Sequence, residues 1–127
     1  MKGYVRQSTQ EDVDFLSTNL RKEDAIEVLS SHGDIKEALQ IGFDESEECW
    51  TIVVTDTEEV AGMYGIARYD DDVAIPWLLT SPAIESIWLP FLRGSRKWVE
   101  EMNDKYPILT NACDADYTKA INWLRFV

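Results

Sequence analysis

Cysteine, histidine and positive charge are scarce in this sequence, and each shortage argues against a class of protein. With one pair of cysteines, Cys49 and Cys113, and a single histidine, we expect buried thiols in a reducing compartment rather than disulfides or a metal site. No apolar run is long enough to span a membrane. Residues 1–9 lack the apolar stretch of a secretory signal. We therefore expect an intracellular protein with no membrane partner.

The shortage of basic residues leaves a formal net charge of −12 at pH 7. Residues 1–72 hold 18 acidic and 6 basic residues, whereas residues 73–127 hold 6 of each. The first part would repel a polyanion and the second would not attract one, so we do not expect nucleic-acid binding. The acidity is typical of a soluble surface; mimicry of nucleic acid by an acidic inhibitor is the alternative.

Apolar residues, in contrast, are plentiful. Hydrophobic residues make up 45% of the 127 residues and aromatic residues 11%, with five tryptophans. This composition is globular rather than disordered, and the length suits one core. We expect a single domain, 1–127, with most tryptophans in the core and some facing a partner.

Hydrophobic spacing predicts an alternation of strands and helices. Thr9 and Asp12 have the spacing of a capping box and indicate a helix start, and Gly33 indicates a helix end. Pro90 must kink or divide the helix that follows Ser81 and Pro82. The predicted order is β-α-α-α-β-β-β-α-β-α, with strands at 3–8, 49–55, 60–69, 73–79 and 106–115 and helices at 9–21, 22–33, 34–43, 81–102 and 114–127.

This order and several local motifs resemble the GNAT superfamily, the GCN5-related N-acetyltransferases. Residues 4–24 look like the first strand and helix of that fold, and residues 114–127 look like its fourth helix. The resemblance implies an α/β (α+β) fold with a mixed, mainly antiparallel central sheet flanked by helices. Five segments are similar to small GNAT-like proteins of tailed phages, including relatives of an internal virion protein: ECW, IPWLL, FLRGSRKWVEEM, YPILTNACDA and INWLRFV.

The phage resemblance implies a viral protein in the host cytoplasm or in the virion. In GNAT proteins the fourth helix runs into Gly-Phe and a final strand or hairpin, whereas this sequence stops at Val127. With the C-terminal strand or strands missing, the edge of the strand at 107–113 would be bare. We expect a protein partner, a second copy or further residues to cover it.

The resemblance also implies where acetyl-CoA or CoA would bind. In the family, a loop of the form Gln/Arg-x-x-Gly-x-Gly/Ala gives backbone N–H groups to the pyrophosphate. Here Gly94 is preceded by Phe91 and followed by Arg96, which depart from that pattern. Arg93, Ser95 and Arg96 can bind phosphate through side chains, or the segment can be a continuous helix with a basic outer face, which we favour.

The second part of the implied site is the opening between the fourth and fifth strands, where pantetheine pairs with backbone. Pro76 cannot donate to a ladder, so we place it at a bulge, an edge or the point where the strands part. Trp77, Leu78 and Leu79 would then line the opening. With Arg93, Gly94, Ser95 and Arg96 they form our candidate acyl-CoA site.

Acid–base groups for acyl transfer are weakly represented. Leu124 stands where many GNAT enzymes have the tyrosine that protonates the thiolate, and Tyr117 lies at the wrong end of that helix. His32 is expected in a loop, solvated rather than a general base. Glu47 and Glu48 are expected in a solvated acidic turn. No catalytic residue is assigned, and no metal-ligand spacing is present.

One further stretch, RKEDAIEV, lies near the usual acceptor-binding helix and matches a recurring patch in the phage set. We interpret its Arg21, Glu23, Asp24 and Glu27 as a solvated helix face. The reading that follows is a phage-type GNAT-fold protein with a degraded acyl-CoA site, acting as a structural or interaction protein in phage assembly or infection. The alternatives are an active acetyl-CoA-dependent N-acyltransferase and an acidic inhibitor of a host enzyme.

Overall fold

A computed structural model describes residues 2–109 of the chain. The predicted order of elements is confirmed through the fifth strand, and the helix predicted at 114–127 lies outside the described residues. The elements are β1 (Gly3–Gln7), α1 (Gln10–Ser17), α2 (Lys22–His32), α3 (Ile35–Glu45), β2 (Glu48–Val54), β3 (Val60–Arg68), β4 (Val73–Thr80), the 3₁₀ helix η1 (Pro82–Ser86), α4 (Trp88–Lys105) and β5 (Ile108–Leu109).

The five strands form one sheet in the order β1-β2-β3-β4-β5. Neighbours are antiparallel except β4 and β5, which are parallel, with Val73 opposite Ile108 and Ala74 opposite Leu109. A parallel pair needs a long crossover, and α4 supplies it. The mixed, mainly antiparallel sheet is therefore confirmed.

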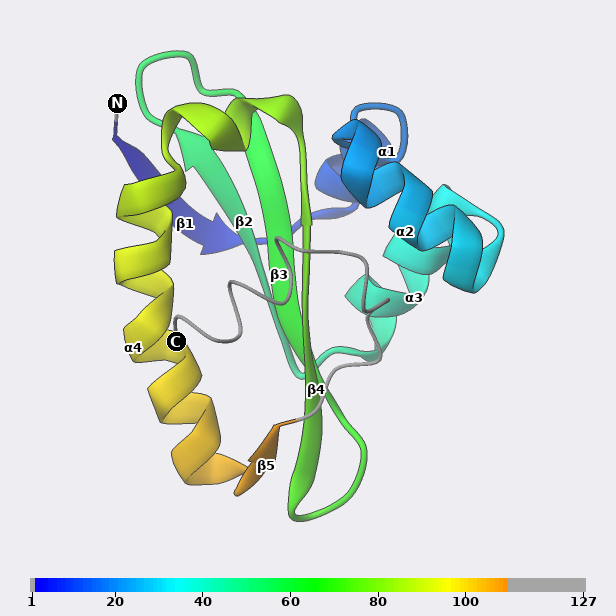
Figure 1. Ribbon diagram of the computed structural model, residues 1–127, viewed down its shortest axis with the longest axis vertical. Helices are drawn as coiled ribbons and strands as arrows, with labels where there is room; N and C mark the ends of the chain where they lie inside the picture. The colour runs from blue at the N-terminus through cyan, green and yellow to red at the C-terminus, as the bar shows by residue number, and fades with distance from the viewer. Residues whose placement is uncertain (1, 110–127) are drawn as a thin grey trace.

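Helices cover both faces of the sheet, α4 on one side and α1 to α3 on the other (Figure 1). Alternation along the strands divides the core accordingly. Ile52 and Tyr64 pack with Phe91 and Val99 of α4, whereas Met63 packs with apolar residues of α1 and α3. Side chains on the two faces of these strands thus belong to two separate cores.

The helix ends follow from local chemistry. The Asp12 carboxylate accepts the Thr9 N–H at 2.9 Å, as the capping-box spacing predicts. Asp34 caps α3 by accepting the Glu37 N–H at 2.8 Å, and Gly33 ends α2 with a φ of 79°. The placement of His32 in a loop was wrong, because it is the last residue of α2.

Pro90 has the expected effect on the segment after β4, which is divided rather than continuous. The 3₁₀ helix η1 ends at Ser86, Ile87 is the N-cap of α4, and Pro90 falls in the first turn of α4. A missing N–H costs little there, because first-turn N–H groups have no partner within the helix.

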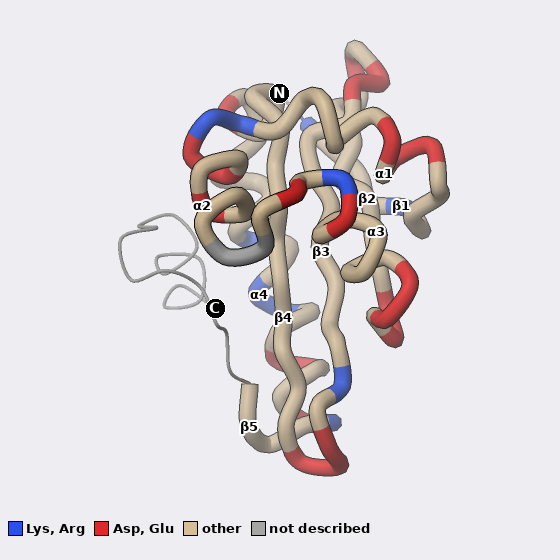
Figure 2. The backbone as a smooth tube through the Cα atoms, turned by 90° about the vertical axis from the view of Figure 1, so that its right-hand side faces the viewer, with Lys and Arg blue, Asp and Glu red and all other residues tan. Residues whose placement is uncertain are grey.

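Acidic residues gather on helices and turns, as on the turn between β3 and β4 (Figure 2). Within that turn the Asp70 carboxylate accepts the N–H groups of Asp72 and Val73, each at 2.8 Å. Among the described residues no helix combines the length and the apolar character that crossing a membrane requires.

Candidate functional site

The outer edge of β4, away from β3, is the first part of the candidate site. Ser81 N–H donates to Ala61 O and Tyr69 N–H donates to Val73 O, so odd-numbered residues of β4 bond to β3. Pro76, opposite Ile66, therefore has its nitrogen on the outer edge. An edge was one of the places predicted for Pro76, and β3–β4 pairing continues through it.

Trp77, Leu78 and Leu79 do not share one face of β4. Trp77 and Leu79 pack against the α1 and α3 core, and the Trp77 indole Nε1 donates to Ser46 Oγ at 2.7 Å. Leu78 packs against the α4 core. Within the described chain β5 pairs with β4 only at Val73 and Ala74, before these residues.

The other four candidate residues lie in the middle of α4, a different element. Arg93 and Arg96 are exposed, and Arg96 Nε lies 3.7 Å from Glu100 Oε1. Ser95 is buried and donates to Leu92 O at 3.1 Å. Because the helix begins at Trp88, the N–H groups of residues 93–96 belong to its interior. Residues 91–97 thus lie within one unbroken helix, α4, whose outer face is basic, as we expected.

The N-terminus of α4 is where backbone donors would meet an anion. Ile87 N–H donates to Ile84 O at 3.1 Å and Phe91 N–H to Ile87 O at 2.9 Å, while Pro90 has no N–H. None of these three positions therefore presents a free N–H to an anion. Sequence comparison with the family loop missed this place, because it required a glycine and residues 81–87 contain none.

A buried ionic cluster lies beside the end of β4. Arg21 Nη1 donates to Glu85 Oε1 of η1 at 2.7 Å, and Arg21 N–H donates to Thr80 O at 2.8 Å. Asp24 Oδ2 accepts from Thr80 N–H at 2.7 Å and from the Thr80 hydroxyl. The start of α2 therefore occupies both outward-facing backbone groups of Thr80. We call Arg21, Asp24, Thr80 and Glu85 the α2 cluster.

The α2 cluster corrects the interpretation of the RKEDAIEV stretch as a solvated face at Arg21 and Asp24, whereas Glu23 is exposed as expected. Arg21 is 4% exposed and Asp24 is fully buried. Asp24 Oδ1 lies 3.6 Å from Arg21 Nη2 and makes no hydrogen bond within the described residues. Burial raises the pKa of Asp24 above its usual value, although hydrogen bonds from Thr80 and the charge of Arg21 oppose this effect.

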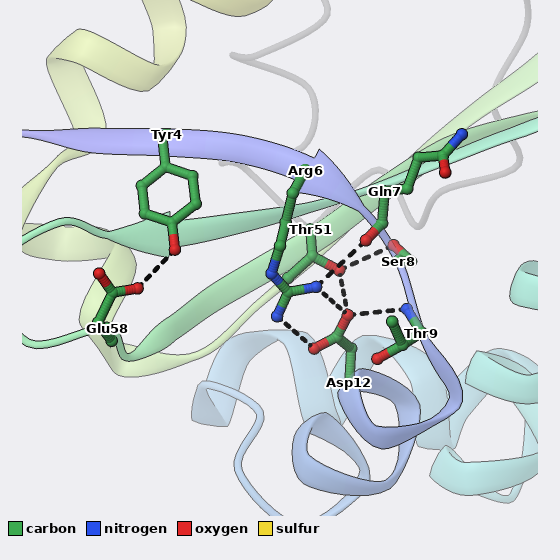
Figure 3. Close-up of polar contacts among 8 residues, drawn as sticks. All are labelled: Tyr4, Arg6, Gln7, Ser8, Thr9, Asp12, Thr51 and Glu58. Carbon is green, nitrogen blue, oxygen red and sulfur yellow. Dashed lines mark hydrogen bonds and ion pairs between the residues drawn. The ribbon is translucent and has the colours of Figure 1, made fainter.

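A second buried carboxylate, Asp12, lies at the start of α1 (Figure 3). Arg6 donates to both of its oxygens, at 2.8 and 2.9 Å, and the Thr51 hydroxyl donates at 2.8 Å. Burial alone would raise the pKa of Asp12, but the hydrogen bonds from Arg6, Thr9 and Thr51 outweigh it and hold the pKa below its usual value. We call Arg6, Thr9, Asp12 and Thr51 the α1 cluster.

Glu48 is less solvated than a turn would make it, whereas Glu47 is exposed in the bend before β2, as expected. Glu48 begins β2, and its Oε1 accepts from the indole Nε1 atoms of Trp50 and Trp98 at 3.1 and 3.2 Å. Glu47 accepts from the Tyr106 hydroxyl, which lowers the pKa of Glu47. Both bind residues distant in sequence, so the solvated-turn interpretation was wrong for Glu48 and incomplete for Glu47.

Other candidate groups add little chemistry. Cys49 is a half-buried free thiol whose pKa burial raises. Cys113, Tyr117, Trp123 and Leu124 lie outside the described residues. No group of three or more histidine, cysteine, aspartate or glutamate side chains in residues 2–109 is arranged to hold a metal ion.

Comparisons with known proteins identify the fold. No family model and no curated protein matches the chain. One similar solved structure is a "putative phosphinothricin N-acetyltransferase", with a TM-score of 0.66, 9% identity, and coverage of 98% of this chain and 80% of that chain. Another is a GNAT-family acetyltransferase from Bacillus anthracis, with a TM-score of 0.64, 7% identity, and coverage of 98% and 78%. The chain has the GNAT acetyltransferase fold.

Proposed function

We propose that this GNAT-fold chain acts as a structural or interaction protein and that its acyl-CoA site is degraded. The observation that carries the proposal is the ion pair of 2.7 Å between Arg21 and Glu85, which lies beside the end of β4 and just before α4. Glu85 brings a carboxylate to the turn that precedes α4, where a helix N-terminus would otherwise meet an anion. An internal anion there repels an incoming one.

The backbone around Glu85 fits the pyrophosphate of acetyl-CoA poorly as well. Anion sites at helix N-termini depend on several convergent N–H donors. The N–H of Ile87 is already donated to Ile84 O, and Pro90 has none. Exposed cations such as Arg93 and Arg96 contribute only about 0–1 kcal/mol each as surface pairs, whereas micromolar affinity requires about 8 kcal/mol.

The resemblance to small tailed-phage proteins supports a role in phage assembly or infection, in the host cytoplasm or the virion. The partner is a protein or a second copy of the chain that covers the strand predicted at 107–113, of which residues 110–113 lie outside the described part. An N-acyltransferase is the second candidate, and one observation favours it: two solved acetyltransferases share this fold. Fold alone does not decide between these functions, because activity depends on the site.

Titration of acetyl-CoA into the purified chain by calorimetry at near-physiological salt tests the proposal. We expect no binding tighter than about 1 mM, which corresponds to about 4 kcal/mol. A Glu85→Gln variant is the matched probe, because it removes the internal anion and should bind more tightly than the natural chain. Micromolar binding by the natural chain that disappears in an Arg93→Ala, Arg96→Ala double variant would establish the acyltransferase site instead.

A further inference from the structure

A cavity of about 310 Å³ lies between α4 and the sheet face made by β1, β2 and β3. The two flanking elements, α4 and β1, lie side by side in Figure 1. The lining of the cavity includes Val5, Ile52, Tyr64, Phe91, Gly94 and Ser95, and it contains no residue of the α2 cluster. The cavity is therefore separate from the outer edge of β4 and from the α2 cluster, although Gly94 and Ser95 of the candidate acyl-CoA site form part of its wall.

The lining is mostly apolar and includes the side chain of Tyr64. Tyr64 is 5% exposed, and its ring packs against Trp98 at 4.8 Å and Phe91 at 5.9 Å between ring centroids. Its hydroxyl makes no hydrogen bond to any residue in 2–109, whereas Ser95 donates to Leu92 O and Tyr4 to Glu58. The hydroxyl is therefore open to a hydrogen bond with a ligand, which contributes about 0.5–1.5 kcal/mol.

Tyr64 stays neutral over the whole physiological range. Burial, and then the charge of Glu48, raises its pKa to about 12. A neutral phenol can both donate and accept a hydrogen bond. The side chain therefore suits a neutral polar group on a ligand, and the formal net charge of −12 on the chain disfavours an anion there.

Gly94 keeps one wall of the cavity open. Ile87, Pro90, Phe91, Gly94 and Ser95 recur at the spacing of one helix face, and all five line the cavity. A Cβ on Gly94 would meet nothing within 4 Å, so packing does not require a glycine. A glycine inside a helix costs about 0.5–1 kcal/mol relative to alanine. That cost is explained if a larger side chain would obstruct what the cavity holds.

We propose that this cavity binds a small neutral aromatic molecule whose single polar group hydrogen bonds to the hydroxyl of Tyr64. The volume is about twice that of the roughly 150 Å³ cavity known to hold benzene. It also lies at the lower end of the roughly 300–1,000 Å³ of ligand sites. A substituted single ring or a bicycle such as indole fits these dimensions, and the Tyr64 and Phe91 rings provide edge and face contacts.

The test is a titration of the isotopically labelled chain with phenol, and with toluene as the isostere without a hydroxyl, followed by amide chemical shifts. We expect saturable shifts centred on Val5, Ile52 and Gly94, with phenol bound about 3–10-fold more tightly than toluene through one hydrogen bond. In Tyr64→Phe, phenol should fall to the affinity of toluene, and toluene should be unchanged.

A second pair of variants tests the cavity itself. Gly94→Leu should abolish binding of both probes, and Gly94→Ala, which the helix accommodates without contact, should weaken it severalfold. Lys97→Leu adds the same side chain to an exposed position of α4 outside the cavity and should leave both affinities unchanged. Shifts that do not saturate, equal binding of phenol and toluene, or full binding by Gly94→Leu and Gly94→Ala would overturn the proposal.

Discussion

The α1 cluster and the α2 cluster are built from the same parts and behave in opposite ways. In each, a buried aspartate near the start of a helix meets an arginine and a threonine of a strand. Yet the pKa of Asp12 is lowered and that of Asp24 is raised. Burial raises both pKa values, and the hydrogen bonds that oppose it differ: Arg6 donates to both oxygens of Asp12, whereas Arg21 is held by Glu85 and lies 3.6 Å from Asp24.

This difference distinguishes Asp12, which stabilises the fold, from Asp24, which is buried at a cost in folding stability. A fully hydrogen-bonded pair joins β1, α1 and β2 and has no oxygen left for other work. A fully buried carboxylate with one oxygen unsatisfied destabilises the fold. Groups that are retained at such a cost concentrate at functional sites. The comparison assigns the α1 cluster to folding and directs functional experiments to the α2 cluster.

The largest expected effect is the loss of Asp12. Asp12→Ala leaves the Thr9 N–H and the Thr51 hydroxyl without their acceptor and removes the partner of Arg6, which is 39% exposed, so it should cost about 2–3 kcal/mol. Urea unfolding measures the free energy of unfolding directly. Asp14→Ala, an exposed position on the same helix, is the control and should change stability by no more than about 0.5 kcal/mol. A loss below about 1 kcal/mol for Asp12→Ala would remove the α1 cluster from its structural role.

A smaller effect is expected from Thr51, which reaches Asp12 from β2. Thr51→Val keeps the shape of the side chain and removes the hydroxyl, so it should cost about 1–2 kcal/mol and raise the pKa of Asp12. Thr55→Val, at an exposed position, is the matched control. Equal unfolding midpoints for the two variants would mean that the Thr51 hydroxyl adds nothing to the α1 cluster.

How far the sequence predicts these two clusters differs for a physical reason. The Thr9–Asp12 spacing is local, so a pattern within one turn indicates the α1 cap. The partners of the α2 cluster are remote: Asp24 bonds to Thr80 across 56 positions and Arg21 to Glu85 across 64. Hydrophobic periodicity does not indicate either of these two contacts. The charged residues around Arg21 and Asp24 have the pattern of a solvated helix face.

The same distinction explains the rest of the comparison between sequence and structure. The long helix between the strands at 73–79 and 106–115 predicts from the sequence alone that they pair in parallel, as β4 and β5 do, because a crossover is a property of one continuous segment. The family loop pattern led to Gly94 in the middle of α4, whereas the turn that precedes the helix contains Glu85 and no glycine. Short motifs locate a site only where the backbone geometry that gives them meaning is also present.

The opposite pKa shifts predict opposite dependences of stability on pH. Asp12 has a folded pKa below its unfolded value near 3.9, so its contribution is present above that value and is lost as pH falls through the folded pKa. Asp24 has a raised folded pKa, so its contribution is greatest below the unfolded value and is lost as pH rises through the folded one.

Urea midpoints of the natural chain, Asp12→Asn and Asp24→Asn, measured from about pH 2.5 to 7, separate the two carboxylates. The stability advantage of the natural chain over Asp12→Asn should grow with pH. Its advantage over Asp24→Asn should shrink with pH, beginning near the unfolded value of about 3.9. If the stability advantage over both variants changed with pH in the same direction, the contrast between Asp12 and Asp24 would be wrong.

The smallest effect on stability, and the sharpest test of the comparison, comes from Glu85. Its side chain is 57% exposed, so Glu85→Gln should change the free energy of unfolding by no more than about 1 kcal/mol. The substitution weakens the pull of Glu85 on Arg21 and removes a negative charge near Asp24. Both changes favour the ionised carboxylate, so the pKa of Asp24 should fall and approach the behaviour of Asp12. Carboxyl carbon shifts of the labelled chain measure that pKa directly, with Glu23→Gln, 3.8 Å from Arg21 and also exposed, as the control. An unchanged or higher pKa of Asp24 in Glu85→Gln would mean that burial alone sets it and that the competition for Arg21 is not the cause of the difference.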